Sequence, residues 1–181
     1  MTAASTLLPQ FFPRSWEDEH DVFGAAFTED VTVGFVSRGH GGYSYLLATD
    51  ARARALSHEN LLPEALHNLA KMRDGAELKI ARPPGSTVAW VSADDNFAAV
   101  RMLLPWVKSK LLAELGEGFL FTLPSRDLCL FWTASSPAEV SEKHAREARE
   151  DYESEEEYNL SPHVYVYTDR WPCRRWKEAK A

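Results

Sequence analysis

Four side chains in three predicted turns are the candidates for a ligand or partner site. Arg126 and Asp127 lie together in the turn at residues 124–127, and an arginine that a carboxylate orients is a typical anion-binding group. The alternative is that Asp127 caps the turn while Arg126 is solvated or paired locally. The pair therefore predicts either an anion site or an ordinary charged turn.

The other two candidates are Asp94 and His40. Asp94, with Asp95 and Asn96, offers the oxygen ligands that a divalent cation prefers, although an acidic pair is also what a helix N-terminus favours. His40 lies in the glycine-rich turn at residues 38–42 and is the histidine best placed for general-base chemistry. No nucleophile stands beside it in the sequence, so an inert turn histidine is the alternative.

The other residue types that catalyse reactions or bind metals form no recognisable set. The two cysteines and six histidines make neither a disulfide framework nor a pattern of zinc ligands. Cys129 alternates into an apolar strand, which predicts a buried structural thiol. The glycines at 39, 41 and 42 lie in a hairpin instead of between a strand and a helix, so they do not indicate a phosphate-binding loop. We expect no catalytic residue, no metal and no cofactor.

Charge is distributed unevenly along the chain. The 181 residues carry 20 Lys and Arg against 27 Asp and Glu, and this net charge of -7 argues against a dedicated nucleic-acid binder. Residues 139–157 hold nine acidic and three basic residues, whereas residues 170–181 hold five basic residues and one acidic residue. The basic segment also contains two tryptophans, so we expect it to dock on its own acidic helix or on a partner. Nucleic-acid contact by this segment is the weaker alternative. The candidate docking residues are Trp171, Arg174, Arg175, Trp176, Glu150 and Glu153.

Three β-hairpins, each followed by a helix, are the elements that would position these residues. Alternating apolar residues predict strands on both sides of the turns at residues 38–42, 83–85 and 124–127, with a last strand at 164–167. The pattern predicts an α+β fold with a mainly antiparallel sheet and helices packed on one face. The units recur about every 40 residues, which fits either a true duplication or a recurring supersecondary motif.

Serine and proline residues indicate where the helices begin and bend. Ser57 is a predicted N-cap, Pro63 suits the first turn of the first main helix, and Pro105 should kink the second helix. The third helix begins after Ser136 with a proline at its first position. We predict an irregular or short-helical lead-in over residues 1–28, a single α+β domain over 29–169, and a basic aromatic tail over 170–181.

Residues 77–169 resemble the YtpQ-like family of uncharacterised bacterial proteins. Three passages carry the resemblance: residues 94–105 (DDNFAAVRMLLP), residues 123–128 (LPSRDL) and residues 159–165 (NLSPHVY). The family tends to continue through a glycine turn after the last strand, whereas this chain has Asp169-Arg170-Trp171-Pro172. The resemblance supports the predicted fold and implies no activity, because the family is a domain of unknown function.

Two classes of function remain open. The first is a non-catalytic protein-interaction module of the bacterial cytoplasm, of the adaptor, chaperone-like or inhibitor type, whose partner is another protein or a second copy of the chain. The alternative is a small-ligand-binding protein or an enzyme that uses Arg126 and Asp127. No stretch approaches the roughly 18 apolar residues of a membrane helix, and residues 1–5 have no signal-like pattern, so we expect a cytoplasmic protein without membrane contact.

Overall fold

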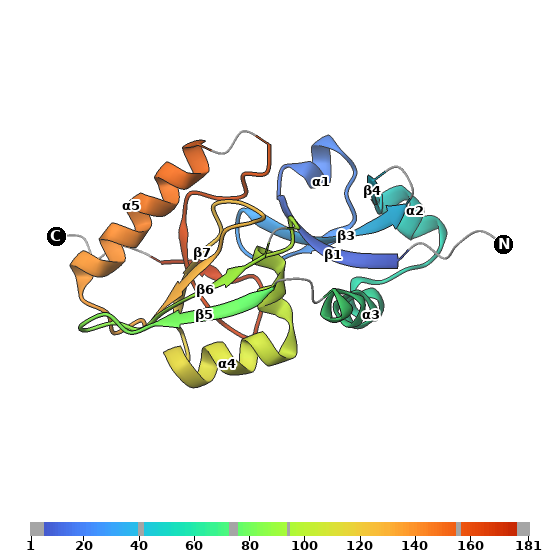
Figure 1. Ribbon diagram of the computed structural model, residues 1–181. Coiled ribbons are helices and arrows are strands. Elements are labelled where there is room, and N and C mark those ends of the chain that lie inside the picture. Colours follow the sequence, from blue (N-terminus) through green and yellow to red (C-terminus); the bar gives the residue numbers. More distant parts are fainter. Residues whose placement is uncertain (1–5, 40–41, 73–75, 94, 155–156, 177–181) are drawn as a thin grey trace.

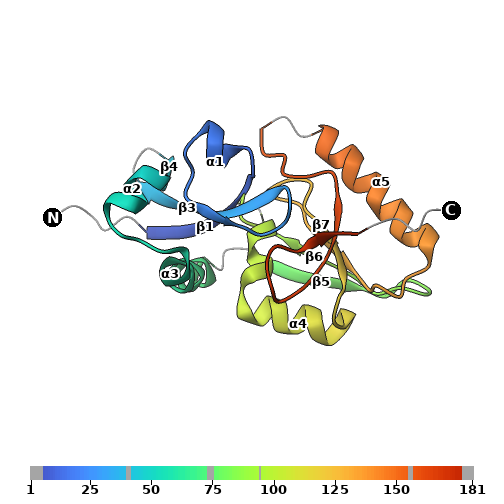
Figure 2. The ribbon, with the colours of Figure 1, turned by 180° about the vertical axis from the view of Figure 1, so that it is seen from behind.

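Two antiparallel sheets form the framework of the molecule. The structure is a computed structural model that describes residues 6–39, 42–72, 76–93, 95–154 and 157–176. The two sheets lie side by side in Figure 1, and Figure 2 shows the same arrangement from behind. Five α-helices and ten strands occur in the described part of the chain, and the prediction of an α+β fold is confirmed.

The first sheet has the strand order β1-β3-β2, and β4 pairs with the far end of β3. Its longest ladder joins β1 to β3 over eight residue pairs, from Thr6 opposite Arg38 to Pro13 opposite Val31. The strands are β1 (Thr6–Pro13), β2 (Gly24–Ala26), β3 (Val31–Gly39) and β4 (Gly42–Tyr45).

The prediction that residues 1–28 are an irregular or short-helical lead-in is wrong for Thr6–Pro13, which forms the strand β1. Pro9 and Pro13 are compatible with a strand here because β1 is at the sheet edge and pairs only on one side, so a proline nitrogen can face away from the ladder. The strand is buried from Leu8 to Phe12, which gives it far more core contact than a lead-in would have.

The second sheet has six strands in the order β10-β9-β7-β8-β6-β5. One of its two edge strands, β10, lies in the segment predicted as a separate tail: Arg174 pairs with Val166 and Arg175 with Tyr165. Residues 170–176 are therefore part of the domain, because their backbone completes the sheet edge. The strands are β5 (Glu77–Ala81), β6 (Val88–Ser92), β7 (Leu120–Thr122), β8 (Leu130–Trp132), β9 (Val164–Val166) and β10 (Arg174–Arg175).

Helices cover both faces of the second sheet, so the prediction that they pack on one face is wrong. Phe121 and Phe131 belong to the main core together with the apolar side of α4, whereas Leu120 and Trp132 pack in a second cluster with Ala145 of α5. Neighbouring strand residues point to opposite faces, and here both neighbours are large and apolar, so each face needs its own cover. The helices are α1 (Trp16–Glu19), α2 (Ala48–Ala53), α3 (His58–Lys71), α4 (Pro105–Leu115) and α5 (Ala138–Ser154).

Pro63 and Pro105 occupy helix positions that differ from those predicted. Pro105 does not kink one long helix: a 3₁₀ helix, η1 (Ala99–Leu103), ends before it, and Pro105 is the first residue of α4. Leu104 is extended because a residue before proline avoids the α conformation. Ser57 does cap α3, accepting a hydrogen bond from Asn60 N at 3.3 Å, but Pro63 lies beyond the first turn of that helix.

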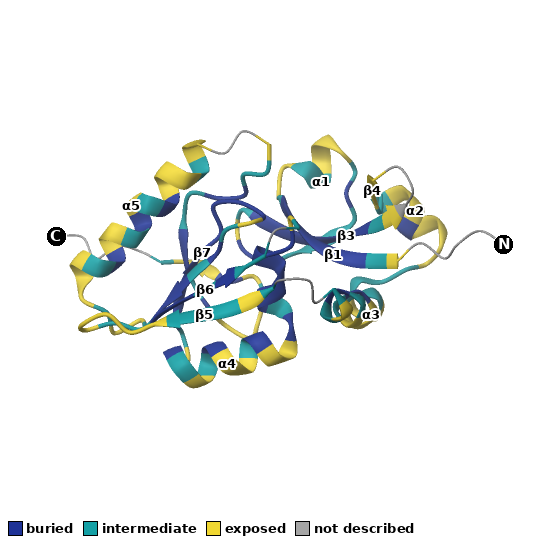
Figure 3. Ribbon diagram, viewed as in Figure 1, coloured by how far each residue is buried: buried dark blue, intermediate teal, exposed yellow. Residues whose placement is uncertain are grey.

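An ion pair between the buried Arg101 and the partly exposed Asp95 closes the side of the core between α3 and η1. Figure 3 shows the buried residues concentrated where the two sheets meet. Arg101 is 1% exposed there and donates to both carboxylate oxygens of Asp95, at 2.7 and 2.6 Å, and to the backbone oxygen of Met72 at 3.1 Å. The pair ties the loop after β6 to the end of α3.

We expect Asp95→Asn to lower the free energy of unfolding by about 3 kcal/mol, because it leaves the buried Arg101 guanidinium without its counter-charge. Urea denaturation measures the change. Glu114→Gln is the control: it removes a carboxylate from surface ion pairs with Arg82 and Lys110 and should hardly shift the midpoint. Equal losses in the two variants would contradict the role given to Asp95.

Candidate functional site

The turn between β7 and β8 carries Arg126 into the interior. Arg126 is 6% exposed, and its backbone is held on both sides: its N–H donates to the oxygen of Tyr158 at 3.1 Å, and its oxygen accepts from Ala99 N at 2.9 Å. The turn therefore folds back against the start of η1 and the residues after α5, and Arg126 is not a solvated hairpin tip.

Aromatic rings surround the Arg126 guanidinium. Its Cζ lies 5.0 Å from the ring centre of Phe12, 5.4 Å from that of Trp16 and 5.2 Å from that of Tyr158. The Nε–H donates to the backbone oxygen of Phe11 at 3.2 Å. Ring faces attract a cation most strongly where water is excluded, so these contacts hold the guanidinium in one position.

Burial lowers the pKa of Arg126, while Tyr45, Tyr158 and Asp127 act in the opposite direction. Arginine nevertheless stays protonated, because its ordinary pKa is far above neutrality. The site thus holds a positive charge that has lost most of its hydration. An anion placed against it would interact more strongly than with a solvated arginine.

A pocket of about 210 Å³ opens beside this guanidinium. Gln10 and Asn96 meet at one side of it, where Gln10 Nε2 donates to the backbone oxygen of Asn96 at 2.7 Å. The rings of Tyr43 and Phe97 pack edge to face, with centres 5.4 Å apart. The lining residues are Gln10, Val36, Tyr43, Tyr45, Asn96, Phe97, Arg126 and Tyr158.

The structure treats the four predicted ligand-site residues differently. Arg126 lines the pocket, and Asp127 is exposed in the same turn. His40 and Asp94 lie outside the described residues, although Tyr43 and Asn96, close to them in the sequence, line the pocket. The sequence patterns did not point to Gln10, Tyr43, Tyr45 or Tyr158. The turn signals pointed to the right segments, but only the packing shows which side chains meet.

The predicted docking residues of the C-terminal segment are fixed on their own chain. Trp171 packs edge to face on Phe27, with ring centres 5.0 Å apart, and Arg174 and Arg175 form β10. Trp176 donates its backbone N–H to Val164 at 2.8 Å and packs with the cluster that contains Ala145 of α5. Glu150 and Glu153 are exposed on α5.

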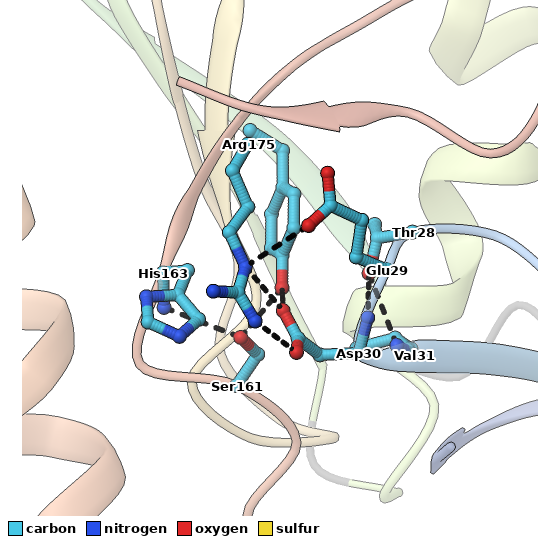
Figure 4. Close-up of polar contacts among 8 residues, drawn as sticks. Thr28, Glu29, Asp30, Val31, Ser161, His163 and Arg175 are labelled. Carbon is cyan, nitrogen blue, oxygen red and sulfur yellow. Dashed lines mark hydrogen bonds and ion pairs between the residues drawn. The ribbon is translucent and has the colours of Figure 1, made fainter. Parts of the chain in front are cut away.

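Residues 171–176 of the segment do dock on their own chain, but the carboxylate that holds Arg175 is Asp30, at the turn before β3 (Figure 4). Arg175 Nε donates to Asp30 Oδ2 at 3.1 Å, and Nη2 donates to Oδ1. The hydroxyl of Tyr165 also donates to Asp30 Oδ2 and lies 2.6 Å from Ser161 Oγ. This cluster joins the first sheet to β9 and β10 of the second.

Cys129 and the described side chains that can ligate metals add no reactive group to the Arg126 pocket. Cys129 is fully buried, as predicted, and burial raises the pKa of its thiol to about 12, so it is a poor nucleophile at neutral pH. Within the described ranges, no group of three or more His, Cys, Asp or Glu side chains is arranged to hold a metal ion. The helices of those ranges include none with both the length and the apolar character to cross a bilayer.

The Asp30 cluster predicts a stability that depends on pH. Burial alone would raise the pKa of Asp30, but hydrogen bonds from Arg175 and Tyr165 outweigh it, so the net pKa lies below its ordinary value. A carboxylate with a lowered pKa stabilises the fold above its ordinary pKa, near 4, and this stabilisation disappears as the pH falls through the lower, folded-state value.

We therefore expect Asp30→Asn to cost roughly 1–3 kcal/mol of unfolding free energy at pH 7 and clearly less at pH 2–3, measured by urea denaturation at both pH values. Glu29→Gln is the neighbouring control. Glu29 makes a longer contact with Arg175 Nε, at 3.5 Å, and its side chain is 52% exposed, so its loss should change the unfolding free energy little. A cost for Asp30→Asn that is the same at both pH values would contradict the assignment.

The comparisons with known proteins leave the chain unassigned: no family model, no curated protein and no solved structure matches it.

Proposed function

We propose that this protein binds a small organic monoanion, a carboxylate on a planar or aliphatic body, in the pocket beside Arg126. The observation that carries the proposal is the nearly buried guanidinium on the pocket wall. A buried charge is costly to the fold, and a bound anion would offset that cost. A single cation balances one negative charge, so a carboxylate fits better than a dianionic phosphate.

The walls and the size of the pocket limit the rest of the ligand. Tyr43, Tyr45 and Phe97 offer ring surfaces, and the first two are 43% and 41% exposed, so they stand at the entrance. The volume of about 210 Å³ corresponds to roughly seven water molecules, which is enough for a benzoate-sized molecule and little more.

The three passages that resemble the YtpQ-like family meet at the turn that carries Arg126, and the first two contribute Asn96, Phe97 and Arg126 to the pocket, which supports the choice of site. Ala99 N donates to the Arg126 oxygen at 2.9 Å and so joins the first passage to the second. Leu160 N donates to the Pro124 oxygen at 2.8 Å and so joins the third passage to the second. Membership of that family, and a place in the bacterial cytoplasm, are proposals that go with this function.

The test compares benzoate with benzamide, which has a similar shape but no charge, by calorimetric titration. We expect benzoate to bind at least about tenfold more tightly, because only the carboxylate pairs with Arg126. Arg126→Met should abolish the preference for benzoate, and Arg174→Gln, a change of an exposed arginine in β10, should leave it intact.

A substitution at the pocket entrance tests the proposal even if the Arg126 variant does not fold. Tyr43→Ala alters an exposed ring that lines the pocket and should weaken benzoate binding several-fold in a folded protein. Equal affinity for benzoate and benzamide, or no binding of either, would overturn the proposal.

A second candidate function is the protein-interaction module, which a groove along α5 favours. The groove has a volume of about 340 Å³, an apolar floor that includes Leu128 and Leu130, and acidic side chains at Glu147, Glu150 and Asp151. Burial raises the pKa of Asp151, and the neighbouring carboxylates act in the same direction. A partner segment rich in lysine and leucine would place its apolar side chains on this floor and its charges beside the carboxylates.

We expect a short lysine–leucine peptide to bind the protein, with an affinity that falls as salt is added. The double variant Glu150→Gln, Asp151→Asn should weaken binding roughly tenfold, whereas the double variant Glu139→Gln, Glu142→Gln changes the same helix outside the groove and should not. Fluorescence anisotropy of the labelled peptide measures both. Equal losses in the two variants would show that only the overall charge of α5 matters.

A further inference from the structure

A second pocket, distinct from that of Arg126, lies between α5 and the β9–β10 edge. Its volume is about 250 Å³, and none of its lining residues lines the Arg126 pocket. Three of the side chains are cationic or can become so, and one is an indole. The lining residues are Ala145, Arg149, Pro162, His163, Val164, Arg175 and Trp176.

We propose that this pocket binds a mononucleotide, with the phosphate held by Arg149, His163 and Arg175 and the base stacked on Trp176. Each part of the ligand is complementary to a feature of the pocket. A phosphate needs several N–H donors that converge from different elements, and a planar base needs an aromatic face beside them.

Arg175 is already oriented for this role. Its contacts with Asp30 and Glu29 are made through Nε and Nη2, and a guanidinium carries five N–H donors in a fixed plane. Figure 4 shows the remaining nitrogen of the guanidinium turned towards the side on which His163 lies. Because Asp30 already fixes the side chain, binding an anion would cost little further rotamer entropy.

His163 lines the pocket with both arginines, and the carboxylates that hold Arg175 also act on its charge. Burial lowers the pKa of His163, and the charges of Arg175 and Arg149 lower it further, against the opposing effects of Asp30 and Glu29. The imidazole is therefore neutral at pH 7 in the unliganded protein. A phosphate in the pocket would reverse the local field and raise that pKa, so binding should be accompanied by proton uptake below neutral pH.

Trp176 supplies the wall that distinguishes a nucleotide from a bare phosphate. The indole is half-buried and packs against a cluster that includes Ala145 and Val164, so its position is set by the core. Stacking on an aromatic ring contributes ~1–3 kcal/mol per base. The net charge of -7 disfavours a long nucleic-acid strand, which would meet the acidic surface of α5 beyond the pocket.

The test follows the imidazole signals of His163 by NMR during titration with adenosine monophosphate, adenosine and inorganic phosphate. We expect the monophosphate to raise the pKa of His163 and to bind at least about tenfold more tightly than adenosine or phosphate alone. Quenching of tryptophan fluorescence should accompany binding and should be reduced in Trp176→Leu.

Matched substitutions on α5 test the phosphate contact. Arg149→Gln should weaken binding of the monophosphate about tenfold, while Arg146→Gln, an exposed arginine on the same helix outside the pocket, should not. Equal effects of the two variants, or an unchanged pKa of His163, would overturn the proposal. Tighter binding of a single-stranded hexanucleotide than of the monophosphate would replace it with a strand-binding site.

Discussion

The Arg126 guanidinium is buried where the two sheets meet, and the packing of both sheets must accommodate its charge. Removing a charge from water costs several kcal/mol, and the protein offsets this with three ring faces and a hydrogen bond to Phe11. The rings come from β1, α1 and the segment after α5. The turn of the second sheet can therefore hold its arginine only when β1 of the first sheet is in place, and the two sheets behave as one folding unit.

The Asp30 cluster provides a second link between the sheets. Asp30 lies in the turn just before β3, and its partners Tyr165 and Arg175 lie in β9 and β10. Phe27 at the end of the first sheet packs on Phe121 of the second sheet, with ring centres 5.8 Å apart. This apolar contact joins the sheets in addition to the contacts of Arg126 and Asp30. Both proposed ligand pockets adjoin these links. Arg126 and Arg175 thus each contribute to the contact between the sheets and line a pocket in which a ligand could meet their charge.

The charge pattern acquires a different meaning in three dimensions. Among the described residues, no ion pair joins α5 to residues 170–176 of the basic C-terminal segment. Arg175 pairs with Asp30, some 145 residues away, while Glu150 stays exposed beside a groove. The protein is acidic overall, yet both proposed ligand pockets are centred on arginine, and so its net charge says little about the sites themselves.

The three hairpins, the cap at Ser57 and the charged turn that contains Arg126 can all be predicted from the sequence, because turn residues and apolar alternation act between neighbours. Features that depend on distant partners appear only in the folded chain. Pro9 suggests an irregular segment, but residues 6–13 pair with β3 as β1, and Arg174 and Arg175 of the basic tail form β10 only because β9 lies beside them. Arg126 meets Phe11 across 115 residues, and no local pattern reports such a contact.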